Sequence, residues 1–277
     1  MNLLYPLAKR FIAGHNFDSA KPKIKELMDQ GYEVSIDYLG ESSSCYEDCL
    51  KARFQYFEII NYYKDEKIDV SIKPSQLGIK LHPLFSYSSL SSLANLAKTF
   101  GHTIRLDMED SSITQMTINQ ALSLNKKFNN VGVAIQANLH RSKEDLRLLK
   151  KNNVSVRIVK GAYKENSLIA FQDPLDIECA FFHYAANMIH ANKTAIGTHD
   201  EELLIDIADM LLHSNNFEYE FLYGIRRDLQ KRWKDEGKKV RIYVPFGHQW
   251  LPYTIRRLKE WKNLKFVIKN MWREWVA

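Results

Sequence analysis

Short runs of β-branched and aliphatic residues recur along the chain, separated by longer segments of helical periodicity. Signals for helix ends support this pattern. Asp173 stands before Pro174 at the start of an expected helix of residues 173–192, Asp200 begins an expected helix of residues 200–213, and Gly101 ends another. The apolar runs cover residues 33–39, 68–73, 103–107, 131–136, 154–160, 194–198, 218–223 and 240–245. Eight units of strand then helix predict a (β/α)8 TIM-type barrel rather than an open sheet.

The residues before the first expected strand have a different character. Residues 19–31 have a helical pattern, so we expect residues 1–32 to form an N-terminal helical arm. Residues 33–277 then form the barrel, which we expect to be the catalytic domain. No linker or low-complexity tract divides the chain further.

The composition is that of an ordinary globular protein, with 45% hydrophobic and 26% charged residues among 277. No apolar run approaches the roughly 20 residues that span a bilayer, and the amino terminus lacks the basic segment of a secretory signal. The cysteines are three in number and form no C-x-x-C pair, so we expect a cytoplasmic protein. The net charge is +6, and the excess of positive charge lies after residue 220. We interpret this basic region first as a solvent-exposed face.

Polar residues stand where the expected strands end, and in this type of barrel those ends form the active site. A helix after the last strand adds Tyr253, Arg256 and Arg257 on one face, because residues three and four apart are neighbours on a helix. Several of these side chains are cationic, which predicts an anionic ligand such as a carboxylate or a phosphate. The polar residues at the strand ends are Lys73, Asp107, Gln136, Arg157, Lys160, Thr198, His199, Tyr223 and Tyr243.

Motifs of several common chemistries are absent. The sequence contains no H-E-x-x-H, no G-x-S-x-G and no G-x-G-x-x-G, so we expect no metal site, no serine hydrolase and no Rossmann-type cofactor. A Schiff-base lysine stays open as an alternative, since Lys73 and Lys160 both end strands in basic surroundings. The segment VKGAY equally suits a bound cofactor, because Gly161 and Ala162 allow close approach to the backbone.

Seven stretches together resemble the proline dehydrogenase family, flavin enzymes that oxidise L-proline on a (β/α)8 barrel. They follow the family's order over about residues 31–260, and the Y-x-x-R-R-x-x-E pattern of the last is the most specific. The resemblance implies FAD-dependent oxidation of L-proline to 1-pyrroline-5-carboxylate, the first step of proline catabolism, with electrons passed to a quinone. The stretches are VSIKPSQLG, IRLDMED, VGVAIQ, RIVKGAY, THD, EFLYG and YVPFGHQWLPYTIRRLKE.

The resemblance also implies roles for individual residues. Asp107 and Arg157 are expected to be catalytic, with the Arg157 cation beside the electron-rich edge of the reduced flavin. The implied substrate-binding residues are Lys73, Tyr163, Leu222, Tyr243, Tyr253, Arg256 and Arg257, with Glu260 supporting the arginine pair. The implied cofactor-binding residues are Met108, Gln136, Arg157, Lys160, Gly161, Ala162, Thr198 and His199.

The sequence departs from the family pattern at a few positions. Asn138 stands where members usually carry a tyrosine, Glu220 where glutamine is frequent and Phe246 where tyrosine is common. Tyr243 favours proline as the substrate, because relatives that act on hydroxyproline tend to have a smaller residue there. A dehydrogenase of hydroxyproline or of another cyclic imino acid, and a non-catalytic barrel that binds an amino acid, remain alternatives.

The position of the last expected helix also has an implication. The chain stops soon after it, without the aldehyde dehydrogenase module that is fused to the barrel in bifunctional relatives, so we expect a stand-alone enzyme. The basic C-terminal region suggests peripheral contact with the inner face of the membrane, where a quinone would accept electrons. No nucleic-acid partner is expected.

Overall fold

The structure is a computed structural model that describes residues 5–260, without the side chains of residues 6, 7 and 258–260. The strands within this range are paired in chain order as a closed barrel, which confirms the predicted fold class. They are β1 (Glu33–Tyr38), β2 (Asp69–Ile72), β3 (Thr103–Leu106), β4 (Val131–Gln136), β5 (Val156–Val159), β6 (Thr194–Gly197), β7 (Phe217–Leu222) and β8 (Val240–Phe246).

Helices alternate with these strands, as the periodicity predicts. Among the described residues, none of them is both long and apolar enough to cross a bilayer. They are α1 (Tyr5–Ala8), α2 (Phe17–Asp29), α3 (Tyr46–Tyr62), η1 (Pro74–Leu77), α4 (Pro83–Thr99), α5 (Ser111–Phe128), α6 (Ser142–Lys151), α7 (Pro174–Asn187), α8 (Glu201–Met210), α9 (Arg227–Asp235) and α10 (Trp250–Glu260).

The chain forms two compact units, which we describe separately. The central unit is Glu41–Tyr219, and the terminal unit combines the described residues of Met1–Gly40 and Glu220–Ala277. The helices α1 and α2 precede β1 and belong to the terminal unit. The division into an arm of residues 1–32 and a barrel domain stays a prediction.

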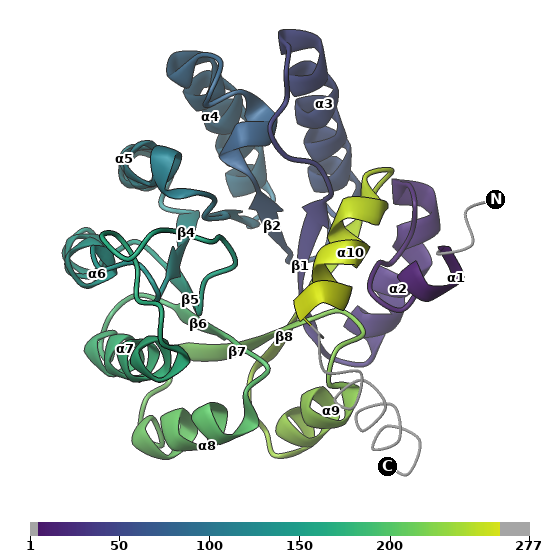
Figure 1. The fold of residues 1–277 in the computed structure, drawn as a ribbon. Coiled ribbons are helices and arrows are strands. Elements are labelled where there is room, and N and C mark those ends of the chain that lie inside the picture. Colours follow the sequence, from purple (N-terminus) through teal and green to yellow (C-terminus); the bar gives the residue numbers. More distant parts are fainter. Residues whose placement is uncertain (1–4, 261–277) are drawn as a thin grey trace. The chain divides into compact units, whose positions relative to one another are not determined.

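In the central unit, β2 to β6 form a parallel sheet whose two faces differ in character. Successive side chains of a strand point to opposite faces. Val70 and Ile72 of β2 are fully buried among apolar residues, and Figure 1 shows the helices α4 to α7 outside the strands. The alternate residues Asp69 and Ser71 lie on the other face, so this sheet has a polar interior.

In the terminal unit, β1 pairs with β8 in parallel register, with Ser35 opposite Tyr243. The N-terminal segment packs against α10, which is yellow in Figure 1. Tyr253 and Trp250 of α10 cover a buried apolar cluster that includes Ala8 and Ile12, and the rings of Tyr5 and Trp250 meet edge to face at 5.3 Å. The residues before β1 thus hold the helix that carries the arginine pair.

Two helices end earlier than the sequence pattern predicts. The expected helix of residues 173–192 ends at Asn187, because Met188 caps it and His190 adopts a left-handed conformation with φ of 62°. The expected helix of residues 200–213 similarly ends at Met210. Polar and apolar residues continue in the helical order past both ends, so periodicity alone does not mark the stop.

Position 224, just after β7, requires glycine because the backbone of the N-terminal segment passes close to it. Its φ of +74° lies in the left-handed region, and a Cβ atom there would collide with the backbone carbonyl oxygen of Arg10. Neither strain nor collision is relieved by a side-chain rotation, because the obstacle is backbone.

We predict that Gly224→Ala lowers the free energy of unfolding by about 3 kcal/mol or more. Gly237→Ala is the matched control, since its φ is +77° but no atom lies within 4 Å of the added Cβ. The control should lose only about 1 kcal/mol, the cost of the left-handed conformation. Urea denaturation of both variants measures the difference, and equal losses would contradict the close approach of Arg10.

Candidate active site

Three predicted residues meet at the carboxyl edge of the central sheet. Asp107 follows β3, and its two carboxylate oxygens face different cations. The Arg157 Nη1 atom donates to Asp107 Oδ1 at 2.7 Å, and the Lys73 ammonium lies 3.5 Å from Oδ2. All three side chains are buried or nearly so, and Asp107 thereby fixes two positive charges on neighbouring strands.

Arg157 lies deeper than a strand-end residue would, because it is the second residue of β5. Its Nη2 atom donates to the Ser71 hydroxyl at 2.8 Å and lies 4.0 Å from Asp69 Oδ2. The guanidinium is thus held from β2 and from the segment after β3. A guanidinium group held by several partners has few accessible rotamers, so the positive charge of Arg157 has a defined position.

Below Arg157 lies a second buried arginine, which the sequence analysis missed. Arg105 in β3 is only 2% exposed, and its Nε atom donates to Asp69 Oδ2 at 3.1 Å. Asp69 also accepts from the Thr103 hydroxyl, and Glu218 lies 3.8 Å from the Arg105 guanidinium. Charged residues in the middle of TIRL and at the start of DVSI were the available indication, since barrel interiors are usually aliphatic.

Glu109 joins two segments at the same edge and was also missed. It accepts from the Ser75 backbone N–H at 2.9 Å and from the Ser75 hydroxyl, which fixes the first turn of η1 just after Lys73. Burial raises the pKa of Glu109, although the two Ser75 bonds oppose this shift. The residue therefore supports the Lys73 segment.

Gln136 at the end of β4 connects three strand ends. Its Nε2 atom donates to the Glu109 carbonyl at 3.0 Å, and its Oε1 atom accepts from the Ala162 backbone N–H at 3.3 Å. Met108 is buried beside Asp107, whereas Gly161 and Ala162 are exposed. The backbone after β5 is therefore open to close approach, as the sequence predicts.

Lys160 has two close partners that the sequence did not indicate. Its ammonium lies 2.7 Å from Glu178 and 2.7 Å from Asp200. Burial opposes ionisation of Asp200, but the hydrogen bond and charge of Lys160 outweigh it and lower the pKa of that carboxyl. Thr198 is buried and its hydroxyl accepts from the Asp200 N–H at 3.2 Å, while His199 and Tyr163 are half-buried.

In the terminal unit the remaining predicted residues lie on β7, β8 and α10. Leu222 ends β7, and Tyr243 is buried in β8. The Arg257 guanidinium lies 5.3 Å from the centre of the Tyr253 ring, a cation–π contact between residues four apart. Arg256 is half-buried on the same helix, and the side chain of Glu260 is outside the described residues.

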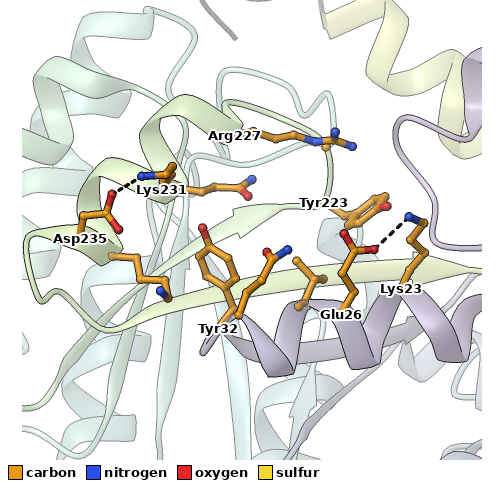
Figure 2. A pocket seen from close by; sticks show the side chains of 12 residues that line it. Lys23, Glu26, Tyr32, Tyr223, Arg227, Lys231 and Asp235 are labelled. Carbon is orange, nitrogen blue, oxygen red and sulfur yellow. Dashed lines mark hydrogen bonds and ion pairs between the residues drawn. The ribbon is translucent and has the colours of Figure 1, made fainter. Parts of the chain in front are cut away.

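A separate cavity of about 470 Å³ in the terminal unit lies between α2 and α9 (Figure 2). Its charges form local pairs, with Lys23 3.0 Å from Glu26 and Lys231 2.6 Å from Asp235. Tyr223, one of the predicted strand-end residues, lines it, whereas the substrate- and cofactor-binding residues implied by the family resemblance do not. Apart from Tyr223, the cavity is therefore distinct from the residues that the sequence singled out.

Comparisons with known proteins identify the family of the chain. The family model described as Proline dehydrogenase matches residues 20–269. Proline dehydrogenase 1 of Bacillus subtilis (strain 168) is 31% identical over 272 residues, in a match that covers 95% of this chain and 90% of the relative. Proline dehydrogenase of Deinococcus radiodurans is 33% identical over 281 residues, in a match that covers 97% of this chain and 91% of the relative.

A solved structure supports the fold. Proline utilization A (PutA) from Bdellovibrio bacteriovorus, inactivated by N-propargylglycine, superimposes with a TM-score of 0.84 at 22% identity. The match covers 92% of this chain and spans 32% of that chain. Fold and matched residues define an enzyme built on a (β/α)8 barrel. The chain belongs to the proline dehydrogenase family, whose members act on proline.

The buried ion pairs lead to a prediction about stability. Asp69→Asn removes the charge that faces Arg105 and Arg157, so we expect the free energy of unfolding to fall by about 3 kcal/mol. Asp18→Asn is the control, because Asp18 pairs with Lys21 in an 83% exposed position and should change stability by less than about 1 kcal/mol. Denaturant titration compares the two, and equal effects would show that the buried pairs do not matter.

Proposed function

We propose that the chain catalyses the FAD-dependent oxidation of L-proline to 1-pyrroline-5-carboxylate, with electrons passed to a quinone. The observation that carries this proposal is the family match over residues 20–269, which includes both the Asp107–Arg157 pair and the helix of the arginine pair. The reaction would be the first step of proline catabolism. The site roles below extend the resemblance to these residues and their contacts.

The residues at the carboxyl edge of the central sheet fit a flavin nucleotide. Gly161 is exposed and has no side chain, the Asn138 side-chain oxygen is buried without a hydrogen-bond partner among the described residues, and Arg157 supplies a fixed cation. FAD, when bound, supplies the two-electron oxidation, which no amino-acid side chain provides. The residues that would hold it are Asp107, Met108, Gln136, Arg157, Lys160, Gly161, Ala162, Thr198 and His199.

The contacts refine what some of these residues do. Asp107 accepts from Arg157, so its role is to hold that cation toward the flavin ring rather than to take a proton. Lys160 is already paired with Glu178 and Asp200, so it would contact a cofactor phosphate only by exchanging one of these carboxylates. Its contribution is therefore mainly the position of the Gly161 backbone that follows.

Binding of L-proline is proposed to rest on its carboxylate. Arg256 and Arg257 offer planar forks to that group, and Lys73 adds a third charge. Glu260 would support the arginine pair. Tyr163, Leu222, Tyr243 and Tyr253 would surround the ring. A carboxylate fixed in this way orients C5 of the proline ring for oxidation. The neutral amine is the reactive form, because its lone pair forms the C=N bond.

Two alternatives remain within this proposal. Hydroxyproline or another cyclic imino acid presents the same carboxylate, and the bulk of Tyr243, which is buried in β8, is the reason to favour proline. A barrel that only binds an amino acid would need no flavin. Peripheral contact with an anionic membrane surface, through the basic C-terminal region, would bring the enzyme to a membrane quinone.

We predict that Arg256→Met raises the KM for L-proline roughly 10- to 100-fold, because a charge-assisted bond to the carboxylate is lost. The flavin content of the purified protein should stay unchanged. Arg147→Met is the control, since Arg147 is 69% exposed on α6 and should leave KM unchanged. Steady-state assays with a soluble quinone as acceptor measure this effect and also test the acceptor.

Different results overturn different parts of the proposal. An unchanged KM in Arg256→Met would contradict the carboxylate role of α10. Proline-dependent reduction of an artificial dye, without reduction of the quinone, would contradict only the proposed electron acceptor. A colourless protein in which borohydride traps a carbonyl substrate on Lys73 or Lys160 would instead indicate a Schiff-base enzyme.

A further inference from the structure

Asn138 lies just past the end of β4, on a backbone that is held from both sides. Its N–H donates to the Lys160 carbonyl at 3.0 Å, and its carbonyl accepts from the Phe171 N–H at 2.8 Å. The residue is 7% exposed. The two backbone bonds leave the start of its side chain little freedom, so the amide is directed by the fold.

The Asn138 side chain lacks the hydrogen bond that a buried amide normally makes. Its Oδ1 atom is buried and has no partner among the described residues. The amide packs against Gly161, where an added Cβ would collide with it and where φ is +118°. Buried acceptors without partners are rare in folded proteins, and a missing ligand is one of the few physical explanations.

The neighbouring amide shows the contrast. Gln136, two residues earlier, uses both ends of its side chain, because Nε2 donates to the Glu109 carbonyl and Oε1 accepts from the Ala162 N–H. Gln136 therefore connects strand ends within the protein. Asn138 offers an acceptor at the same edge, beside the exposed backbone of Gly161.

We propose that Asn138 is a further cofactor-binding residue, whose Oδ1 accepts a hydrogen bond from a hydroxyl or amino group of the flavin nucleotide. The inference rests on the proposed FAD chemistry. A flavin nucleotide carries such donors on its ribityl chain, on its ring system and on its adenine. Asparagine at this position thus replaces the contact area of an aromatic ring with one directed polar bond.

The test is the affinity of the apoprotein for FAD, measured by calorimetry or by quenching of flavin fluorescence. Asn138→Leu keeps the size of the side chain but removes the acceptor, and we expect the Kd for FAD to rise about 10-fold, which is ~1.4 kcal/mol. The apoprotein should not be destabilised, because its buried oxygen had no partner to lose. Asn138→Ala is the second variant, in case the leucine does not fit.

Asn130→Leu is the matched control. Asn130 stands directly before β4, at the opposite end of that strand. Its Oδ1 atom is likewise buried without a partner among the described residues, but its Nδ2 atom donates to the Ala94 and His102 carbonyls at 3.0 and 3.2 Å. Its replacement should lower the stability of the protein but leave the Kd for FAD within about twofold. Asn138→Leu should therefore weaken FAD binding without loss of stability, and Asn130→Leu should lower stability without loss of FAD binding.

FMN serves as a second ligand and divides the possible donors. A loss of affinity with both FMN and FAD supports a bond to the ring or the ribityl chain, and a loss with FAD alone supports a bond to the adenine part. An unchanged Kd for both ligands in Asn138→Leu and Asn138→Ala overturns the inference. Failure of the unaltered apoprotein to bind FAD overturns the proposed cofactor itself, so the two failures are distinguishable.

Discussion

The buried charges of the central sheet are the constraint on which the site depends. Asp69 faces Arg105 at 3.1 Å and lies within 4.0 Å of Arg157, so one carboxylate on β2 serves two guanidinium groups. Burial of unpaired charges would be costly, and the strands must therefore keep their register for each charge to find its partner. Arg157 in turn positions Asp107 at the edge, and Asp107 positions Lys73.

Polar side chains and backbone groups also hold the segments of the carboxyl edge in place. Glu109 fixes the segment after β2, Gln136 joins the ends of β3, β4 and β5, and Asn138 is tied by its backbone to Lys160. Each of these bonds comes from a residue that ends a strand or follows one. The open backbone at Gly161 and the buried acceptor of Asn138 are then the parts of this edge that remain for a cofactor.

The sequence predicted the barrel well, because strand runs and helical segments alternate and each is short enough to be recognised. It also predicted the contact of Tyr253 with Arg257, since residues four apart on a helix are neighbours. It did not predict the partners of Arg157 and Lys160, because Asp69, Glu178 and Asp200 lie far from them in the chain. The early end of α7 was missed for a different reason, since the apolar pattern continues beyond the turn at His190.

The central claim is that this chain oxidises L-proline with a bound flavin. Anaerobic titration of the purified protein with L-proline, followed by its visible absorbance, tests the claim most directly. We expect a yellow protein whose flavin absorbance is lost on addition of L-proline, and much less with hydroxyproline at the same concentration. A protein that carries flavin but keeps its absorbance at saturating L-proline would contradict the proposed reaction.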